Sequence, residues 1–124
     1  MATMTTIRRN RPYERGDVVL ALFPNSDLRT AKTRPVVIVQ TTNLGTGLAQ
    51  YVVAMVSSNL SRANHPSRVL VRQASPEGQR AGLLSDSVIM TDNLATLAAT
   101  EITRRIGELD MTLVNAALRH TLGL

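Results

Sequence analysis

Residues 16–40 read GDVVLALFPNSDLRTAKTRPVVIVQ, and this stretch predicts two strands joined by a polar loop. The first strand, VVLALF (18–23), ends at Pro24, before the turn letters NSD. The second strand, VVIVQTT (36–42), is an almost continuous β-branched run, which is typical of a strand buried on both faces. The first third of the chain therefore indicates a β-rich core.

Further strand patterns follow in QYVVAMVSS (50–58), SRVLVR (67–72) and SVIMT (87–91). In the middle one, alternation places Val69 and Val71 on one face of the strand. The letters NLGTG (43–47) separate the second strand from the third, and residues 75–82 (SPEGQRAG) are predicted to form a loop.

The last third of the chain combines an ambiguous segment with a predicted helix. In residues 92–109, the spacing of Ile102 and Ile106 suits a helical turn, yet ITRRI is equally compatible with a strand. A helix then follows, with Asp110 as its N-cap and Gly123 as its end. Its apolar face is formed by Met111, Val114, Leu118 and Leu122.

These elements predict a mainly β fold with a C-terminal α-helix, a small and strongly bent sheet or barrel with that helix packed on it. A chain of 124 residues has room for one domain, which we place at 13–124. Residues 1–12 are expected to form a flexible basic arm. Without a signal peptide or an apolar run of about 20 residues, the pattern predicts a soluble cytoplasmic protein.

The positive charge is uneven in kind and in position. Thirteen of the fourteen basic residues are arginines, and the formal net charge is +5. Residues 1–62 carry eight basic and three acidic residues, whereas residues 63–124 carry six of each. An arginine-rich half suits a nucleic acid or an acidic protein, because the planar guanidinium matches phosphate and carboxylate oxygens. Scattered solvated arginines explain the composition equally well.

The composition also excludes several classes of site. The chain has no cysteine, which rules out disulfides, thiol nucleophiles and thiolate metal sites. His65 and His120 are too few for a conventional zinc site, and we predict neither a metal nor a cofactor. There is no glycine-rich phosphate loop. What remains is a polar cluster at residues 26–35 and another at Ser57, Ser58 and Asn59, each of which could be ordinary loop polarity.

Together, GDVVLALFPNSDLRTAKTRPVVIVQ, VVAMVSSN, AGLLSDSVIMTDNLATL and VNAALRHTLGL resemble the MazF/PemK family of toxins from type II toxin–antitoxin systems. The resemblance covers residues 14–124, in order and at family-like spacing. It implies an SH3-like barrel of the CcdB/PemK type that forms a homodimer. It further implies a metal-independent, sequence-specific endoribonuclease, an mRNA interferase acting on single-stranded RNA and inhibited by an acidic antitoxin protein.

The family's functional positions transfer to particular residues of this chain. The arginine of the Arg-Pro motif is Arg34, and the hydroxyl residue at the end of the third strand is Ser57; we predict this pair to be catalytic. Where some relatives have an arginine, this chain has Met90, and its first loop lacks the histidine that some relatives use. The resemblance therefore favours an arginine–hydroxyl mechanism over an acid–histidine one. The substrate-binding set is predicted to be Asn25, Ser26, Lys32, Thr33, Ser58, Asn59, Asp92 and Asn93.

Cleavage of RNA is chemically compatible with this pair. The 2′-OH of RNA serves as the nucleophile, so the protein must align it and stabilise charge on the phosphoryl oxygens. A guanidinium can bind those oxygens in bidentate fashion, and a hydroxyl can add one hydrogen bond. Arginine is a poor general base, so Arg34 is expected to stabilise the transition state and to protonate the leaving 5′ oxygen. The resemblance implies products with a 2′,3′-cyclic phosphate and a 5′-OH.

Two alternatives remain at this stage. One is a CcdB-like toxin that inhibits gyrase through the same fold. The other is a catalytically inactive barrel that acts as a protein-binding module. For mutational comparison, Arg104 is expected to lie outside the RNA groove.

Overall fold

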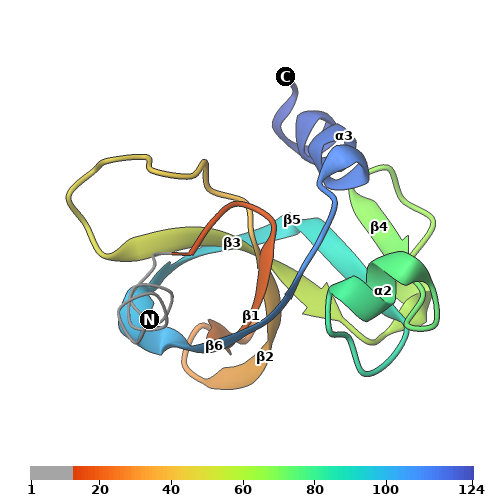
Figure 1. Ribbon diagram of the computed structural model, residues 1–124, viewed down its shortest axis with the longest axis horizontal. Coiled ribbons are helices and arrows are strands. Elements are labelled where there is room, and N and C mark those ends of the chain that lie inside the picture. The colour runs from red at the N-terminus through yellow and green to blue at the C-terminus, as the bar shows by residue number, and fades with distance from the viewer. Residues whose placement is uncertain (1–12) are drawn as a thin grey trace, which may run out of the picture.

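The computed structural model describes residues 13–124, so the predicted N-terminal arm at 1–12 lies outside the described residues. Figure 1 shows a curved sheet with one helix set against it and a shorter helix at its side. In chain order, the elements are β1 (Asp17–Pro24), β2 (Ala31–Ile38), β3 (Gln50–Ser57), η1 (Leu60–Arg62), β4 (Arg68–Val71), α2 (Pro76–Arg80), β5 (Ser87–Ala98), η2 (Ala99–Glu101), β6 (Ile102–Glu108) and α3 (Thr112–Leu122).

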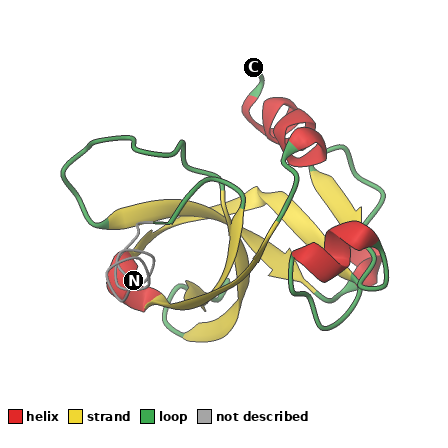
Figure 2. Ribbon diagram, viewed as in Figure 1, coloured by secondary structure: helices red, strands yellow, loops and turns green. Residues whose placement is uncertain are grey.

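All the strands belong to one six-stranded sheet in the order β4-β5-β3-β2-β1-β6. Every neighbouring pair is antiparallel. The sheet bends strongly, and the short helix η2 connects the far end of β5 to β6, the strand at the opposite edge (Figures 1 and 2). The predicted mainly β fold, a strongly bent sheet with a C-terminal helix, is therefore confirmed.

The two faces of the sheet bury different clusters. The interior of the bend is filled by residues such as Val19, Phe23, Val36 and Met55. The outer face is covered by α3 and by the segment that follows α2, and Val18, Val37 and Val56 belong to the cluster buried there. Because successive residues of a strand alternate between faces, β2 contributes to both clusters, as its continuous apolar run predicted. This alternation also determines which polar side chains at the strand ends share a face.

Several predicted boundaries were wrong. β2 begins at Ala31, so Lys32, Thr33 and Arg34 belong to a strand and not to a loop. The predicted loop at 75–82 contains helix α2, whose N-cap Ser75 accepts a hydrogen bond from the Gly78 N–H. The ambiguous segment is mainly strand, because β5 runs on to Ala98 and β6 follows.

The C-terminal helix is present, with different details at its start. Met111 is the N-cap and has no side-chain capping bond, whereas Asp110 accepts a hydrogen bond from the Thr112 N–H at 2.8 Å. Gly123 ends the helix in the left-handed conformation, as predicted. Of the predicted apolar face, Val114 and Leu118 are buried, but Leu122 is 55% exposed because it lies beyond the sheet.

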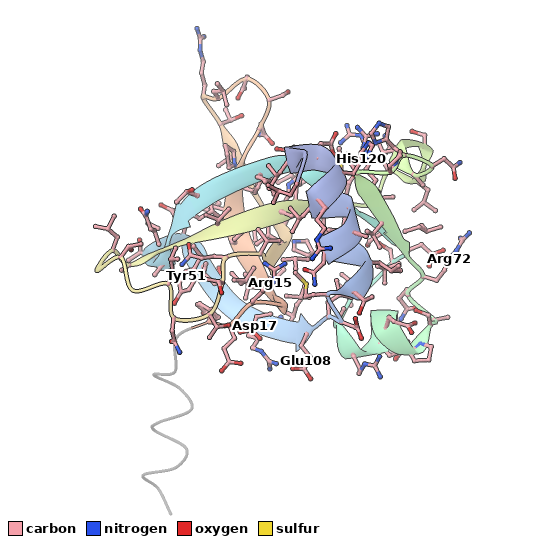
Figure 3. The ribbon with its side chains drawn as sticks, turned by 90° about the horizontal axis from the view of Figure 1, so that it is seen from above. Arg15, Asp17, Tyr51, Arg72, Glu108 and His120 are labelled. Atoms are coloured by element: carbon pink, nitrogen blue, oxygen red, sulfur yellow. The ribbon has the colours of Figure 1, made fainter. Side chains whose placement is uncertain are left out.

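Two arginines fasten the start of β1 to the rest of the domain. Arg15 lies beneath α3 in Figure 3 and bonds to the Val39 carbonyl and to Asn115 of the helix. Arg105 of β6 bonds to the buried Asp17 at 2.8 Å and to Glu108 at 3.1 Å. These contacts tie the start of β1 to the helix α3 and to the edge strand β6.

Candidate active site

Arg34 and Ser57 lie on the same face of neighbouring strands. The ladder between β2 and β3 ends at the pair Val36 and Met55, and both of these side chains belong to the interior cluster. Counting two residues outward along each strand gives Arg34 and Ser57, so alternation directs both toward the interior end of the sheet. The predicted catalytic pair is thus brought to one place by strand register.

The Arg34 guanidinium has almost no protein partner. It is half-buried, and Nη1 contacts the Met55 Sδ at 3.5 Å. Its Nε is buried without a hydrogen bond to any of the described residues. A thioether is a weak acceptor, and a cation withdrawn from water is costly unless an anion accompanies it. The Arg34 guanidinium is therefore available to bind a negatively charged group.

Ser57 is held with its hydroxyl oriented by the backbone. The residue is 6% exposed, and Oγ accepts a hydrogen bond from the Asn59 N–H at 3.1 Å. That bond uses an oxygen lone pair and leaves the hydroxyl proton available for donation. Asn59 itself caps the short helix η1, because its Oδ1 accepts from the Ser61 N–H and hydroxyl.

Asn93 joins the same group. Its Nδ2 donates to the Met55 Sδ at 3.3 Å, so Asn93 and Arg34 meet at one sulfur atom. The register of β3 and β5 shifts between Ala54 and Met55, and this irregularity brings the segment around Asn93 over the end of the interior. The sequence analysis named Arg34 and Asn93 separately, but no sequence pattern indicated that the two meet at the Met55 sulfur.

Arg62 is a candidate that sequence reasoning missed. It comes from η1, and its Nη1 contacts the Met90 Sδ at 3.7 Å. Met90 pairs with Met55 across β3 and β5, so two guanidinium groups approach adjacent methionines. In some relatives the position of Met90 is expected to be an arginine. In this chain the guanidinium next to that position comes from Arg62 of η1. Only a three-dimensional contact reveals this.

Asp92 is engaged by a cation. Arg68 donates to its carboxylate twice, from Nε at 3.3 Å and from Nη2 at 2.8 Å. The hydrogen bond from Arg68 is the main reason that the pKa of Asp92 lies below its usual range. The bond also holds the partly exposed Asp92 carboxylate in place.

The hairpin tip between β1 and β2 extends beyond the body of the sheet (Figure 3). Asn25 bonds to Thr30, four residues before Arg34, which corresponds to about 13 Å along an extended strand. Hydrogen bonds from the Arg29 and Thr30 backbone to Asp27 lower the pKa of that carboxyl. The structure therefore does not bring Asn25 and Ser26 together with the catalytic pair.

A cavity opens beside the pair, on the outer face of the strands. We name it the Arg104 cavity; its volume is about 570 Å³. Among the predicted residues, it takes in Lys32, Thr33, Arg34 and Ser58. Arg104, which we expected to lie outside the RNA groove, lines this cavity, because β6 pairs it with Leu20 of β1 and directs it to the same face. The full lining is Leu20, Lys32, Thr33, Arg34, Pro35, Val56, Ser58, Gly82, Leu83, Leu84, Ser85, Ser87, Arg104 and Ile106.

Within residues 13–124, no group of three or more histidine or acidic side chains is arranged to hold a metal ion. In the same part of the chain, no helix is long and apolar enough to cross a membrane.

Residues 14–122 match the model of the PemK-like, MazF-like toxins of type II toxin–antitoxin systems. The chain belongs to the PemK/MazF toxin family. It is 32% identical over 107 residues to the endoribonucleases MazF2 of Mycobacterium bovis and MazF6 of Mycobacterium tuberculosis, which covers 83% of this chain and 90% of each relative. The resemblance from sequence is thereby confirmed.

Solved structures agree with this family fold. A mycobacterial endoribonuclease, solved in complex with its cognate antitoxin, superposes with a TM-score of 0.68 over 90% of this chain and 96% of its own, at 23% identity. At that identity the likeness concerns the fold. Within the PemK/MazF fold of this chain, the end of the sheet interior is the place where Arg34, Ser57 and Asn93 converge.

Proposed function

We propose that this PemK/MazF-type toxin is an endoribonuclease that cleaves single-stranded RNA at a defined sequence, without a metal ion, through Arg34 and Ser57. The observation that carries the proposal is the Arg34 guanidinium, which is half-buried and, among residues 13–124, bonded only to a thioether, on the same face as the serine at the end of the neighbouring strand. A phosphodiester supplies the anionic oxygens that such a pair lacks. Family membership and the curated MazF endoribonuclease relatives point to the same chemistry.

The hydrogen-bond donors of Arg34, Ser57 and Asn93 suggest a role for each residue in the cleavage of RNA. Attack by the 2′-OH on the adjacent phosphorus forms the 2′-O–P bond and breaks the bond to the 5′ oxygen, which leaves a 2′,3′-cyclic phosphate and a 5′-OH. The 2′-OH proton passes to solvent water, and water later returns a proton to the group that protonates the 5′ oxygen. Arg34 binds the phosphoryl oxygens as negative charge accumulates on them and protonates the departing 5′ oxygen. Ser57, held by the Asn59 N–H, donates one further hydrogen bond. Asn93 is near enough to Arg34 to bond to a base or a phosphate beside it.

The partners follow from the family and the charge. An acidic antitoxin protein is expected to cover the arginine-rich half of the chain, as suits a cytoplasmic toxin that acts as a homodimer. Both RNA and an acidic segment would compete for the cations around Arg34 and Lys32. Their association should weaken with added salt, because exposed charges are screened over about 10 Å at 0.1 M ionic strength.

Purified protein incubated with a mixed single-stranded RNA pool in EDTA tests the proposal. Discrete fragments with cyclic phosphate ends are the expected result, and Arg34→Ala should give none. RNA that stays intact until a divalent cation is added would overturn the metal-independent mechanism. Intact RNA under both conditions, together with stalled gyrase in a supercoiling assay, would favour the gyrase-inhibiting alternative.

A further inference from the structure

The Arg104 cavity combines unpaired cations with apolar surface. Within residues 13–124, the ion pairs use Arg68, Arg72 and Arg105 as cations, and none uses Lys32 or Arg104. Both of these side chains are exposed and border the cavity. Two free cations at one opening favour an anionic ligand, and a phosphate suits arginine in particular.

The floor and rim of the cavity are apolar. Leu20 and Pro35 are half-buried, Leu83 is buried, and Leu84 at the rim is 98% exposed. Leu84 therefore adds exposed apolar surface at the rim, where a ligand in the cavity can contact it. Exposed Ser58 and Ser85 add hydroxyls that can donate or accept hydrogen bonds. Apolar walls with a few polar groups are the usual composition of a small-ligand site, and the volume lies in the usual range.

The chain at residues 80–82, which leads into the cavity wall, is fixed in place by two close backbone contacts. A Cβ atom on Gly82 would lie 2.1 Å from the Ile106 carbonyl oxygen, and one on Gly107 would lie 2.3 Å from the Arg80 carbonyl oxygen. The segment after α2 therefore packs directly on β6, the strand that carries Arg104. The cavity is a built feature of the fold and not a gap between mobile loops.

The cavity begins within one residue of the catalytic pair. Thr33 and Pro35 line it on either side of Arg34, and Ser58 lines it directly after Ser57. Consecutive Cα atoms are only about 3.8 Å apart. Because Arg34 and Ser58 themselves line the cavity, RNA held at Arg34 can continue along the ends of β2 and β3 into it.

We propose that the Arg104 cavity binds the nucleotide next to the cleaved phosphodiester, with its base against the leucines and its phosphate between Lys32 and Arg104. This inference rests on the proposed ribonuclease function and adds a second recognition subsite to it. Single-stranded RNA offers such a nucleotide, because an unstacked base can turn into a pocket and be hydrogen-bonded along its edge. The serine hydroxyls then contribute to the preference for one base at that position.

Two variants separate the phosphate contact from the base contact. Arg104→Ala should raise KM for RNA roughly tenfold, as expected for loss of one charge-assisted hydrogen bond, with kcat within about twofold. For a random-sequence 2′-fluoro RNA 12-mer, which lacks the attacking hydroxyl, it should reduce the slope of log Kd against log salt by roughly 0.7. Leu84→Ser should weaken binding about threefold with an unchanged slope. Leu84→Ser should also relax the base preference at one position beside the cleavage point, whereas Arg104→Ala should weaken binding to all sequences alike.

Matched controls are available elsewhere on the surface. Arg119 is an exposed arginine on α3, and Leu124 is an 88% exposed leucine beyond it; neither lines the Arg104 cavity. Arg119→Ala and Leu124→Ser should leave KM, the salt slope and the base preference at the wild-type values.

The outcomes distinguish this inference from the proposed function. If wild-type protein cleaves RNA and Arg104→Ala matches Arg119→Ala in KM and salt slope, the subsite is wrong and the ribonuclease stands. If wild-type protein cleaves nothing, the 2′-fluoro 12-mer decides: an Arg104-dependent slope keeps the subsite, and no binding removes both. A variant that loses affinity for polyglutamate but not for RNA would assign the cavity to an acidic peptide and overturn the subsite.

Discussion

Arg34 and Ser57 occupy the first same-facing positions beyond the last pair of the β2–β3 ladder. Pro35 lies between Arg34 and Val36 and has no N–H to give to a ladder, which favours the separation of the two strands at this point. The pair is therefore held by strands on one side and open on the other. A site of this kind combines rigid side-chain placement with access for a long substrate.

Replacing Arg34 with alanine should reduce RNA cleavage by at least about 1,000-fold, because the main stabiliser of the phosphoryl charge is lost. Arg34→Lys should recover little of the rate, since an ammonium keeps the charge but cannot present two parallel N–H groups. Cleavage of a fluorescent single-stranded RNA under single-turnover conditions measures both effects.

Stability provides the check on the Arg34 variants. The guanidinium is half-buried with no anionic partner among the described residues, so its removal should leave the melting temperature unchanged or raise it. Arg119→Ala serves as the control for loss of one surface arginine. A well-folded Arg34→Ala that cleaves at the wild-type rate would show that the site has been assigned to the wrong residue.

Ser57→Ala should be milder, lowering the single-turnover rate roughly tenfold to a hundredfold through loss of one hydrogen bond to a charged group. It also removes the acceptor of the Asn59 N–H, at a cost of about 1 kcal/mol in unfolding free energy. Ser57→Thr keeps the hydroxyl and should retain most of the rate. Equal rates for the alanine and wild-type proteins would exclude Ser57 from the mechanism.

The Asp92–Arg68 pair predicts how stability changes in acid. The pKa of Asp92 is lowered in the folded protein, mainly by the hydrogen bond from Arg68, so the pair stabilises the fold above the unfolded pKa of about 4. That contribution, about 1 kcal/mol or less for a partly exposed pair, is lost as the pH falls from 4 toward the lower folded value. Asp92→Asn should therefore be less stable than wild type at pH 7, and the difference should shrink by pH 2. Thermal melts across this range measure it, and a constant difference would contradict the assignment.

The fold could be predicted from sequence because its signals are local. The run VVIV predicted a strand buried on both faces, and Val36 and Val37 indeed enter opposite clusters. Helix α2 was missed because a single turn gives no periodicity, although Ser75 and Pro76 are a recognisable helix start. The start of β2 was missed because residues 31–33 are exposed, so they lack the apolar pattern that marks a strand.

The site could be predicted only in part. Arg34 and Ser57 were named through the resemblance to the family, because an Arg-Pro pair and a serine at a strand end are by themselves compatible with ordinary loop polarity. The contact of Asn93 with Met55 depends on a register shift between β3 and β5, and no sequence pattern announces that shift. The position of Arg104 opposite Leu20 likewise lies between register shifts of β1 and β6 that no sequence pattern announces.

Gly82 tests whether the wall of the Arg104 cavity is held as tightly as its contacts indicate. Its φ is +69°, and a Cβ would lie 2.1 Å from the Ile106 carbonyl oxygen, so Gly82→Ala must displace backbone. We expect it to lower the unfolding free energy by about 3 kcal/mol or more. Gly47→Ala is the matched control, because its φ is +78° with nothing within 4 Å of the added Cβ, and it should cost only about 1–2 kcal/mol. Urea unfolding of both variants gives the comparison. Similar losses for the two would mean that left-handed strain alone accounts for the effect and that the wall yields to an added methyl group.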